Sequence, residues 1–157
     1  MVFPLIAAAV FSSAVPLVPR LRPVALYAAC NDSTPPLERR ELPLSAPNTN
    51  QPAHICVDRR HALHGLTIKQ ASIEHNPDTD MFELTFRFDD RFVASIGKFT
   101  QPLLGQTLVF AVGTRAITAR KLMSLLATGV VTSPYSTERD AQGILELMQD
   151  PRNDGAP

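Results

Sequence analysis

The 157-residue chain has no tryptophan, only two cysteines, and no glycine before position 65. Two cysteines cannot form the dense disulfide framework of a small secreted scaffold. Fifteen basic and fifteen acidic residues give a formal net charge of zero, so the basic surplus typical of nucleic-acid-binding proteins is missing. The sequence contains no G-x-S-x-G elbow, no P-loop and no dinucleotide-binding fingerprint. We therefore expect a protein that is not an enzyme, carries no cofactor and binds no nucleic acid.

Proline and glycine divide the chain in two. Nine of the 14 prolines lie within residues 1–53, whereas all seven glycines lie after residue 64. Residues 30–53 are rich in Pro, Ser, Thr and Asn without an apolar period, which predicts a Pro-rich tether. Residues 54–149 alternate apolar runs with turn signals and form the predicted folded domain, which is large enough to fold alone. Residues 150–157 are expected to be a disordered tail.

Residues 1–29 are predicted to be a signal or anchor segment. Residues 1–19 are uncharged and mostly apolar, and Leu26, Ala28 and Ala29 precede Cys30 as in a lipobox. This pattern favours export and lipid attachment at Cys30, giving a periplasmic, membrane-anchored lipoprotein. Two alternatives stay open: an uncleaved anchor made of residues 1–19, and a misassigned start codon. The sequence does not decide between the inner and outer membranes, although Asn31 slightly favours the outer one.

The clearest strand pattern lies at residues 81–88. Four bulky residues share one face there and require a covering layer: Phe82, Leu84, Phe86 and Phe88. A strand is also expected at residues 66–75, with an irregularity near Gln70. A helix then follows a cap at Asp89 or Asp90 and ends before Pro102; its apolar residues are Phe92, Val93, Ile96 and Phe99.

The remaining pattern completes an α+β fold. Residues 106–112 are apolar on both faces and predict a central strand, followed by a turn at Gly113-Thr114 and a short strand at 116–119. Residues 122–129 are ambiguous between strand and helix, and 130–133 predict a short strand. The last helix is capped by Thr137 and carries Ala141, Ile144, Leu145 and Met148 on one face. We expect a mostly antiparallel sheet with two helices packed on one face, in the order β-β-α-β-β-α.

This pattern resembles the head part of the first periplasmic domain of SecD, the accessory subunit of the bacterial protein-export channel. The similarity covers residues 64–149, from the Phe-rich strand and the helix ending in Thr to the final Thr-capped helix. Residues at matching positions are Phe92, Thr100, Gly105, Leu108, Ala119, Gly129, Thr137, Ala141 and Ile144. The resemblance implies contact with unfolded polypeptide outside the cytoplasm, without the proton-driven membrane helices that move the head in that family.

One face of the strand at residues 81–88 is a candidate peptide-binding surface. Met81, Glu83, Thr85 and Arg87 share this mixed polar face, which would accept an extended peptide if the strand lay at a sheet edge. The alternative is an ordinary solvated face. The expected function is therefore binding of protein or peptide, as an accessory to export machinery or to envelope assembly.

A second candidate site combines imidazoles with a thiol. His54, Cys56, His61 and His64 lie within eleven residues and belong to the ligand types that zinc prefers. Their spacing matches no standard motif, so a metal-binding protein or metalloenzyme is the alternative interpretation. Without a metal, Cys56 is either a buried thiol at the domain edge or, if Cys30 carries no lipid, the partner of Cys30 in a disulfide worth roughly 3 kcal/mol.

Charged clusters in the folded part have plainer interpretations. Asp78 and Asp80 follow a proline and precede a strand, which is typical of solvated turn residues. Arg115, Arg120 and Lys121 form a short basic cluster that either contacts anionic lipid headgroups or faces solvent.

Overall fold

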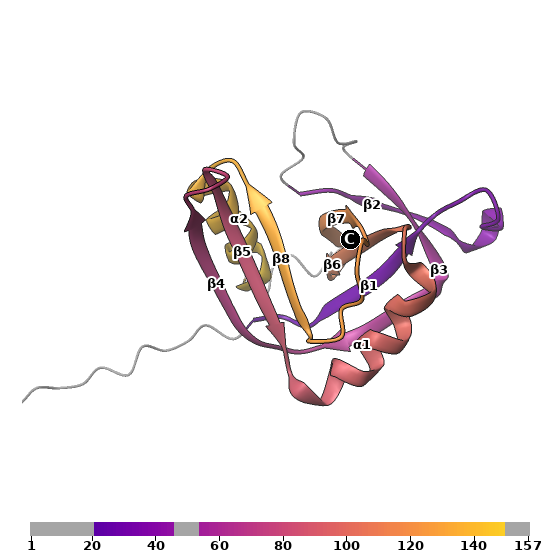
Figure 1. Ribbon diagram of the computed structural model, residues 1–157. Helices are drawn as coiled ribbons and strands as arrows, with labels where there is room; N and C mark the ends of the chain where they lie inside the picture. The colour runs from indigo at the N-terminus through magenta and orange to yellow at the C-terminus, as the bar shows by residue number, and fades with distance from the viewer. Residues whose placement is uncertain (1–20, 46–53, 150–157) are drawn as a thin grey trace, which may run out of the picture.

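The computed structural model describes residues 21–45 and 54–149, and it contains two antiparallel sheets (Figure 1). The five-stranded sheet has the order β2 (Arg39–Pro43), β3 (His54–Leu66), β1 (Val24–Ala29), β6 (Thr107–Val112) and β7 (Arg115–Lys121). The three-stranded sheet has the order β4 (Ile68–Asn76), β5 (Met81–Phe88) and β8 (Val130–Tyr135). The predicted α+β class is confirmed, but the strands that we expected in a single sheet are divided between two sheets.

Both predicted helices form where their caps and apolar periods place them. α1 spans Val93–Thr100, α2 spans Glu138–Gln149, and the 3-10 turns are η1 (Pro36–Glu38), η2 (Asp90–Phe92) and η3 (Gln101–Leu103). The Asp89 carboxylate accepts the Arg91 amide at 3.3 Å, and the Thr137 hydroxyl accepts the Asp140 amide at 3.1 Å. These side chains satisfy amides that an isolated helical turn leaves without partners.

The Phe-rich face of β5 forms the centre of the main core. Leu84, Phe86 and Phe88 are buried, while Phe82 packs against the core from a half-buried position. Ile144 and Met148 of α2 belong to the same cluster, and α2 contacts all three strands of the smaller sheet. Figure 1 shows α2 behind this sheet, whereas α1 follows β5 and leads towards β6. Only α2 therefore covers the smaller sheet as a layer.

The two sheets are joined by a nearly continuous strand. Only Thr67 separates the end of β3 from the start of β4, and Gly65, the second-last residue of β3, has a φ of +73°. The chain can thus leave one sheet and enter the other, because glycine adopts positive φ without steric cost. The irregularity predicted near Gln70 is confirmed as a register shift between Ile68 and Gln70 against β5.

The structure corrects the prediction for residues 21–29. β1 lies between β3 and β6 in the larger sheet, with Leu26 fully buried, so residues 24–29 belong to the folded domain. Removing everything before Cys30 would remove this inner strand. The error has a physical origin, since a short run of small and branched apolar residues suits a signal segment and an inner strand equally.

The tether prediction is also wrong for the described part of residues 30–53. Pro36 begins η1, and Pro43 ends β2 at the edge of the sheet, two positions where a missing N–H is tolerated. Leu42 and Leu44 are buried in a second cluster on the larger sheet. The predictions for residues 1–20, 46–53 and 150–157 lie outside the described residues. Within the described ranges, no helix is long and apolar enough to span a membrane.

Candidate functional site

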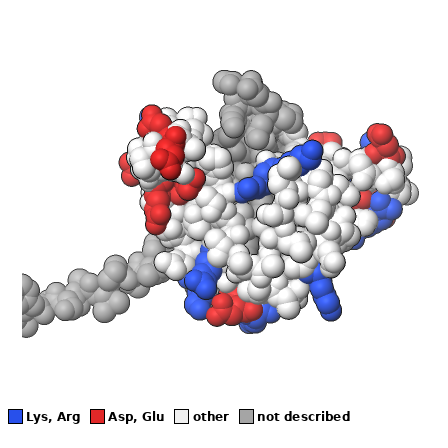
Figure 2. Space-filling view, in the orientation of Figure 1, with Lys and Arg blue, Asp and Glu red and all other residues white. Residues whose placement is uncertain are grey.

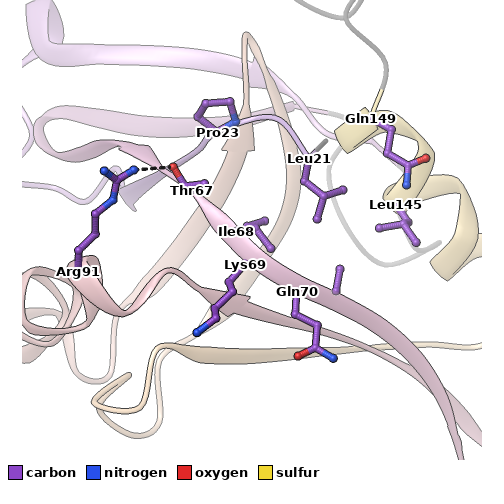
Figure 3. Close-up of a pocket in the computed structure, with 10 residues that line it drawn as sticks. Leu21, Pro23, Thr67, Ile68, Lys69, Gln70, Arg91, Leu145 and Gln149 are labelled. Atoms are coloured by element: carbon purple, nitrogen blue, oxygen red, sulfur yellow. Dashed lines mark hydrogen bonds between the residues drawn. The ribbon is translucent and has the colours of Figure 1, made fainter. Parts of the chain in front are cut away.

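A groove of about 710 Å³ runs beside the first residues of β4 (Figure 3). Its volume lies in the range typical of ligand-binding clefts. Four parts of the chain form it: the segment that leads into β1, the start of β4, η2, and the C-terminal end of α2. The lining residues are Leu21, Pro23, Thr67, Ile68, Lys69, Gln70, Ala71, Arg91, Leu145 and Gln149.

Backbone hydrogen bonds hold the walls of the groove in place. The Arg22 amide donates to the Met148 carbonyl at 2.9 Å, which fixes the segment before β1 to the last turn of α2. The Asp89 amide donates to the Thr67 carbonyl at 2.9 Å and fixes the start of β4 to the turn before α1. The groove is therefore built by main-chain contacts between segments far apart in the sequence.

The floor of the groove is apolar, and its rim carries two cations, Lys69 and Arg91, each beside an aspartate. In the view of Figure 3, Leu21 lies between Ile68 and Leu145, so three elements each contribute an aliphatic side chain. At the rim, the Arg91 guanidinium donates to the Thr67 hydroxyl at 3.3 Å. Lys69 pairs with Asp90 at 3.1 Å, an exposed ion pair that adds little stability. The rim thus presents positive and polar groups around an apolar centre.

The strand beside the groove has an open edge. β4 pairs with β5 on one side, and no described strand pairs with its other side. An edge strand directs alternate backbone N–H and C=O groups away from the sheet, where they can pair with another chain. An apolar groove next to such an edge has the chemistry to hold an extended peptide, with backbone pairing for affinity and pockets for alternate side chains.

The peptide-binding face predicted on β5 required this strand to lie at a sheet edge, and it does not. β5 is the middle strand of its sheet, so Met81, Glu83, Thr85 and Arg87 cannot receive an added strand there. The Glu83 carboxylate accepts a hydrogen bond from the side-chain amide of Asn76 at 3.0 Å. The Thr85 hydroxyl lies 3.0 Å from the hydroxyl of Thr132. Strand addition at β5 is therefore wrong, and the open edge one strand away takes its place.

Cys30 is joined to Cys56 by a disulfide, with Cα atoms 5.4 Å apart. The bond connects the end of β1 to β3, and the Cys30 amide also donates to the Cys56 carbonyl at 2.9 Å. A sulfur engaged in a disulfide cannot carry the thioether-linked lipid, so lipid attachment at Cys30 is wrong. Of the alternatives for Cys56, disulfide pairing with Cys30 is confirmed.

The four metal candidates do not come together. His54, Cys56, His61 and His64 all lie along the extended strand β3, in which each residue advances the chain by about 3.3 Å. Cys56 is already bonded to Cys30, and the His64 ring stacks edge-on against Tyr27. No group of three or more metal-ligating side chains occurs in residues 21–45 and 54–149. The metal interpretation therefore lacks a site in the described part of the chain.

A smaller hollow of about 240 Å³ contains an acid, a histidine and a serine. Asp58 is buried and accepts two hydrogen bonds from the Arg60 guanidinium, at 3.1 and 2.8 Å. These bonds, together with the Arg60 amide and the Thr34 hydroxyl, hold the pKa of Asp58 well below its usual range, against the opposing effect of burial. Asp58 thus stays ionised and pins the segment carrying Thr34 onto β3.

This hollow has no catalytic relay. His61 Nδ1 lies 3.8 Å from Asp58 Oδ2, beyond hydrogen-bonding distance, and the Ser33 hydroxyl donates to Asn31 Oδ1 at 2.6 Å. A nucleophilic serine would instead be hydrogen-bonded to a base that a third group orients. The arrangement is therefore structural, with Asp58 serving as an anchor.

Sequence reasoning missed the groove because one of its walls was assigned to a signal segment and the others were not expected to meet. Leu21 and Pro23 lie in the predicted signal segment, and Leu145 was assigned to the buried face of the last helix. The irregularity near Gln70 was a signal in the right place, since bulges are frequent at sheet edges and next to binding sites.

Comparison with known proteins finds similarity in fold and none in sequence families. No protein-family model and no curated protein matches the sequence. The solved structures that match include SecDF, described as a membrane component that enhances protein export, and SecDF in a super-membrane-facing form. For both, the TM-score is 0.54 and 83% of this chain is covered, with sequence identities of 11% and 10%. The chain spans 63% of the first matched chain and 19% of the second.

The matched structures cover 83% of this chain, which is more than residues 54–157 make up on their own. The similarity therefore includes residues before position 54, which the sequence resemblance at residues 64–149 did not cover. At such low identity the comparison speaks for the fold alone. The predicted resemblance is confirmed at that level: this chain has a SecDF-like fold over most of its length.

Proposed function

We propose that this protein is a non-catalytic binding domain that holds an extended polypeptide segment along the open edge of β4, as an accessory to protein export. The observation that carries the proposal is the groove of about 710 Å³ beside an unpaired strand edge. Backbone pairing along β4 recognises any extended chain, while the floor made by Leu21, Ile68 and Leu145 favours aliphatic side chains. Recognition of this kind suits a protein that handles many unfolded sequences.

Two further observations support a role in export. The fold resembles that of SecDF, whose described function is to enhance protein export. The disulfide between Cys30 and Cys56 is typical of an oxidising compartment such as the periplasm. The partners we propose are unfolded polypeptide and the export machinery, on the outer side of the cytoplasmic membrane.

Calorimetry with a synthetic peptide tests the proposal. The probe is a capped peptide of alternating leucine and serine, titrated into the full chain. Leu145→Glu places a charge in the apolar floor from a half-buried helix position, so we expect at least about tenfold weaker binding, because an unpaired carboxylate would have to be desolvated. The control is Leu37→Glu, which changes a leucine that is 88% exposed on η1, away from the groove.

Three outcomes bear on the proposal. Binding lost in Leu145→Glu and kept in Leu37→Glu supports it. Equal binding by both variants, or no binding by the wild type, overturns it. Circular dichroism of each variant verifies the fold, and if Leu145→Glu fails to fold, Leu145→Ser gives the same comparison with a smaller expected loss.

A further inference from the structure

A long segment of the chain carries charge of one sign only. Residues 91–137 contain five cations and no acidic residue, although the whole chain is neutral. The cations are Arg91, Lys98, Arg115, Arg120 and Lys121. In Figure 2 the acidic side chains lie at the margins of the visible face, while its central part carries blue and white side chains. This stretch of the chain thus carries positive charge only, although Arg91 at its start lies 3.9 Å from Asp89.

The same segment carries most of the exposed large apolar side chains. Four such residues are exposed in the described ranges, and three of them are Leu104, Met123 and Leu125. Met123 is 78% exposed. A single exposed apolar side chain is ordinary, whereas several gathered in one place indicate an interaction surface. The fourth, Leu37, lies in η1.

Backbone pairing brings Leu104 next to the loop that carries Met123 and Leu125. The Gly105 amide donates to the Leu122 carbonyl at 2.8 Å, and the Leu122 amide donates to the Gln106 carbonyl at 2.8 Å. Leu104 therefore lies next to the loop that begins after Lys121, while Leu122 is buried and anchors this loop in the core. We name Leu104, Met123 and Leu125 the apolar tip.

Cations flank the apolar tip on both sides in the chain. Lys121 is exposed and ends β7, immediately before the loop that carries Met123. Lys98 is exposed in the last turn of α1, just before η3 leads to Leu104. Apolar side chains flanked by lysines match a membrane surface, in which anionic headgroups lie above hydrocarbon: the lysines meet the headgroups and the apolar side chains meet the layer below.

We propose that the apolar tip and its flanking lysines dock this domain onto a membrane rich in anionic phospholipid. The apolar side chains enter the boundary between headgroups and acyl chains, and Lys98 and Lys121 pair with phosphates. Docking uses a different surface from the groove beside β4, so it is independent of peptide binding.

Co-sedimentation of the full chain with vesicles tests this docking. One set of vesicles is an equimolar mixture of phosphatidylglycerol and phosphatidylcholine, and the other is phosphatidylcholine alone. We expect binding to the anionic vesicles that weakens with added salt, since exposed charges are screened. The variant Lys98→Gln/Lys121→Gln should bind about 25-fold more weakly, at about fivefold for each cation. Met123→Ser/Leu125→Ser should lose about fivefold or more.

Matched controls separate this site from other routes to the membrane. Arg139→Gln removes an exposed cation from α2, and Leu37→Ser removes an exposed leucine from η1, so both should bind like the wild type. At equal ionic strength, inorganic phosphate should displace no more protein than chloride does, because a soluble anion offers no apolar layer. The proposal is overturned if the tip variants bind like their controls, if both vesicle types bind equally, or if phosphate displaces more protein than chloride at equal ionic strength.

Discussion

Gly129 occupies a position that another residue cannot fill without strain. Its φ is +68°, and a Cβ there would lie 2.8 Å from Cγ2 of Val93, the first residue of α1. Its carbonyl accepts the Phe88 amide at 2.9 Å and so ties the entry of β8 to the end of β5. Backbone conformation and close packing thus act together at this residue.

We expect Gly129→Ala to lower the free energy of unfolding by about 2 kcal/mol, because a side chain would be forced into the left-handed region and against α1. Urea denaturation measures this change. Gly143→Ala is the matched control, since Gly143 lies within α2 with no heavy atom near its would-be Cβ. The control should gain about 0.5–1 kcal/mol, and equal behaviour of the two variants would contradict the role of Gly129.

Asp58 makes stability depend on pH. Its pKa is lowered first by the side-chain hydrogen bonds from Arg60, so the folded state favours the ionised carboxylate more strongly than the unfolded state does. The resulting stabilisation is fully present above the unfolded pKa of about 3.9 and is lost as pH falls towards the lower folded value.

We therefore expect the free energy of unfolding of the wild type to fall more steeply than that of Asp58→Asn between about pH 5 and about pH 2. The difference between the two proteins should be largest near neutral pH. Thermal unfolding over this range measures it, with the exposed Asp32→Asn as control. Parallel curves for the wild type and Asp58→Asn would contradict the anchoring role.

At the scale of elements, β1 depends on its neighbours. It pairs with β3 on one side and with β6 on the other, and the disulfide from Cys30 to Cys56 closes the excursion that holds η1 and β2. A cross-link over 26 residues removes conformational freedom mainly from the unfolded chain.

Replacing both cysteines, as Cys30→Ser/Cys56→Ser, should reduce the free energy of unfolding by about 3 kcal/mol. Reductant should lower the melting temperature of the wild type towards that of the variant and leave the variant unchanged. Mass spectrometry of the unreduced protein provides the direct check. A free thiol or a lipid on Cys30 would contradict the disulfide.

Elements with a strong period were predictable, and those without one were not. The alternation in β5 and the capped period of α2 identify both elements, because each buries one face against the other. β1 has no alternation, since Leu26, Tyr27 and Ala28 are all buried in a strand covered on both faces. Such a run cannot be distinguished from a signal segment by composition.

Whether a strand lies at the edge of its sheet depends on the sheet topology, which local sequence patterns do not show. The face of β5 was correctly identified as opposite to the core, but whether β5 lies at an edge depends on the separate pairings with β4 and β8. For the same reason the histidines of β3 looked close in sequence yet extend along one strand. The candidate groove could therefore not be predicted from the sequence. It forms only where the edge of β4, the end of α2 and the segment before β1 meet.

For the whole molecule, two separate surfaces follow from one two-sheet fold. The groove lies where β4, α2 and the segment before β1 meet, and the apolar tip lies on the loops around β6 and β7. A domain docked by the tip would hold its groove near a membrane surface. A polypeptide leaving an export channel could then be bound before it folds.

Hydrogen exchange measured by NMR tests peptide binding along β4 most directly. The full chain is compared with and without the capped leucine–serine peptide. The account predicts new protection at alternate amides within residues 68–76, with the amides of β8, the other edge of the same sheet, unchanged. Protection confined to β8, or exchange in β4 that the peptide leaves unaltered, would contradict it.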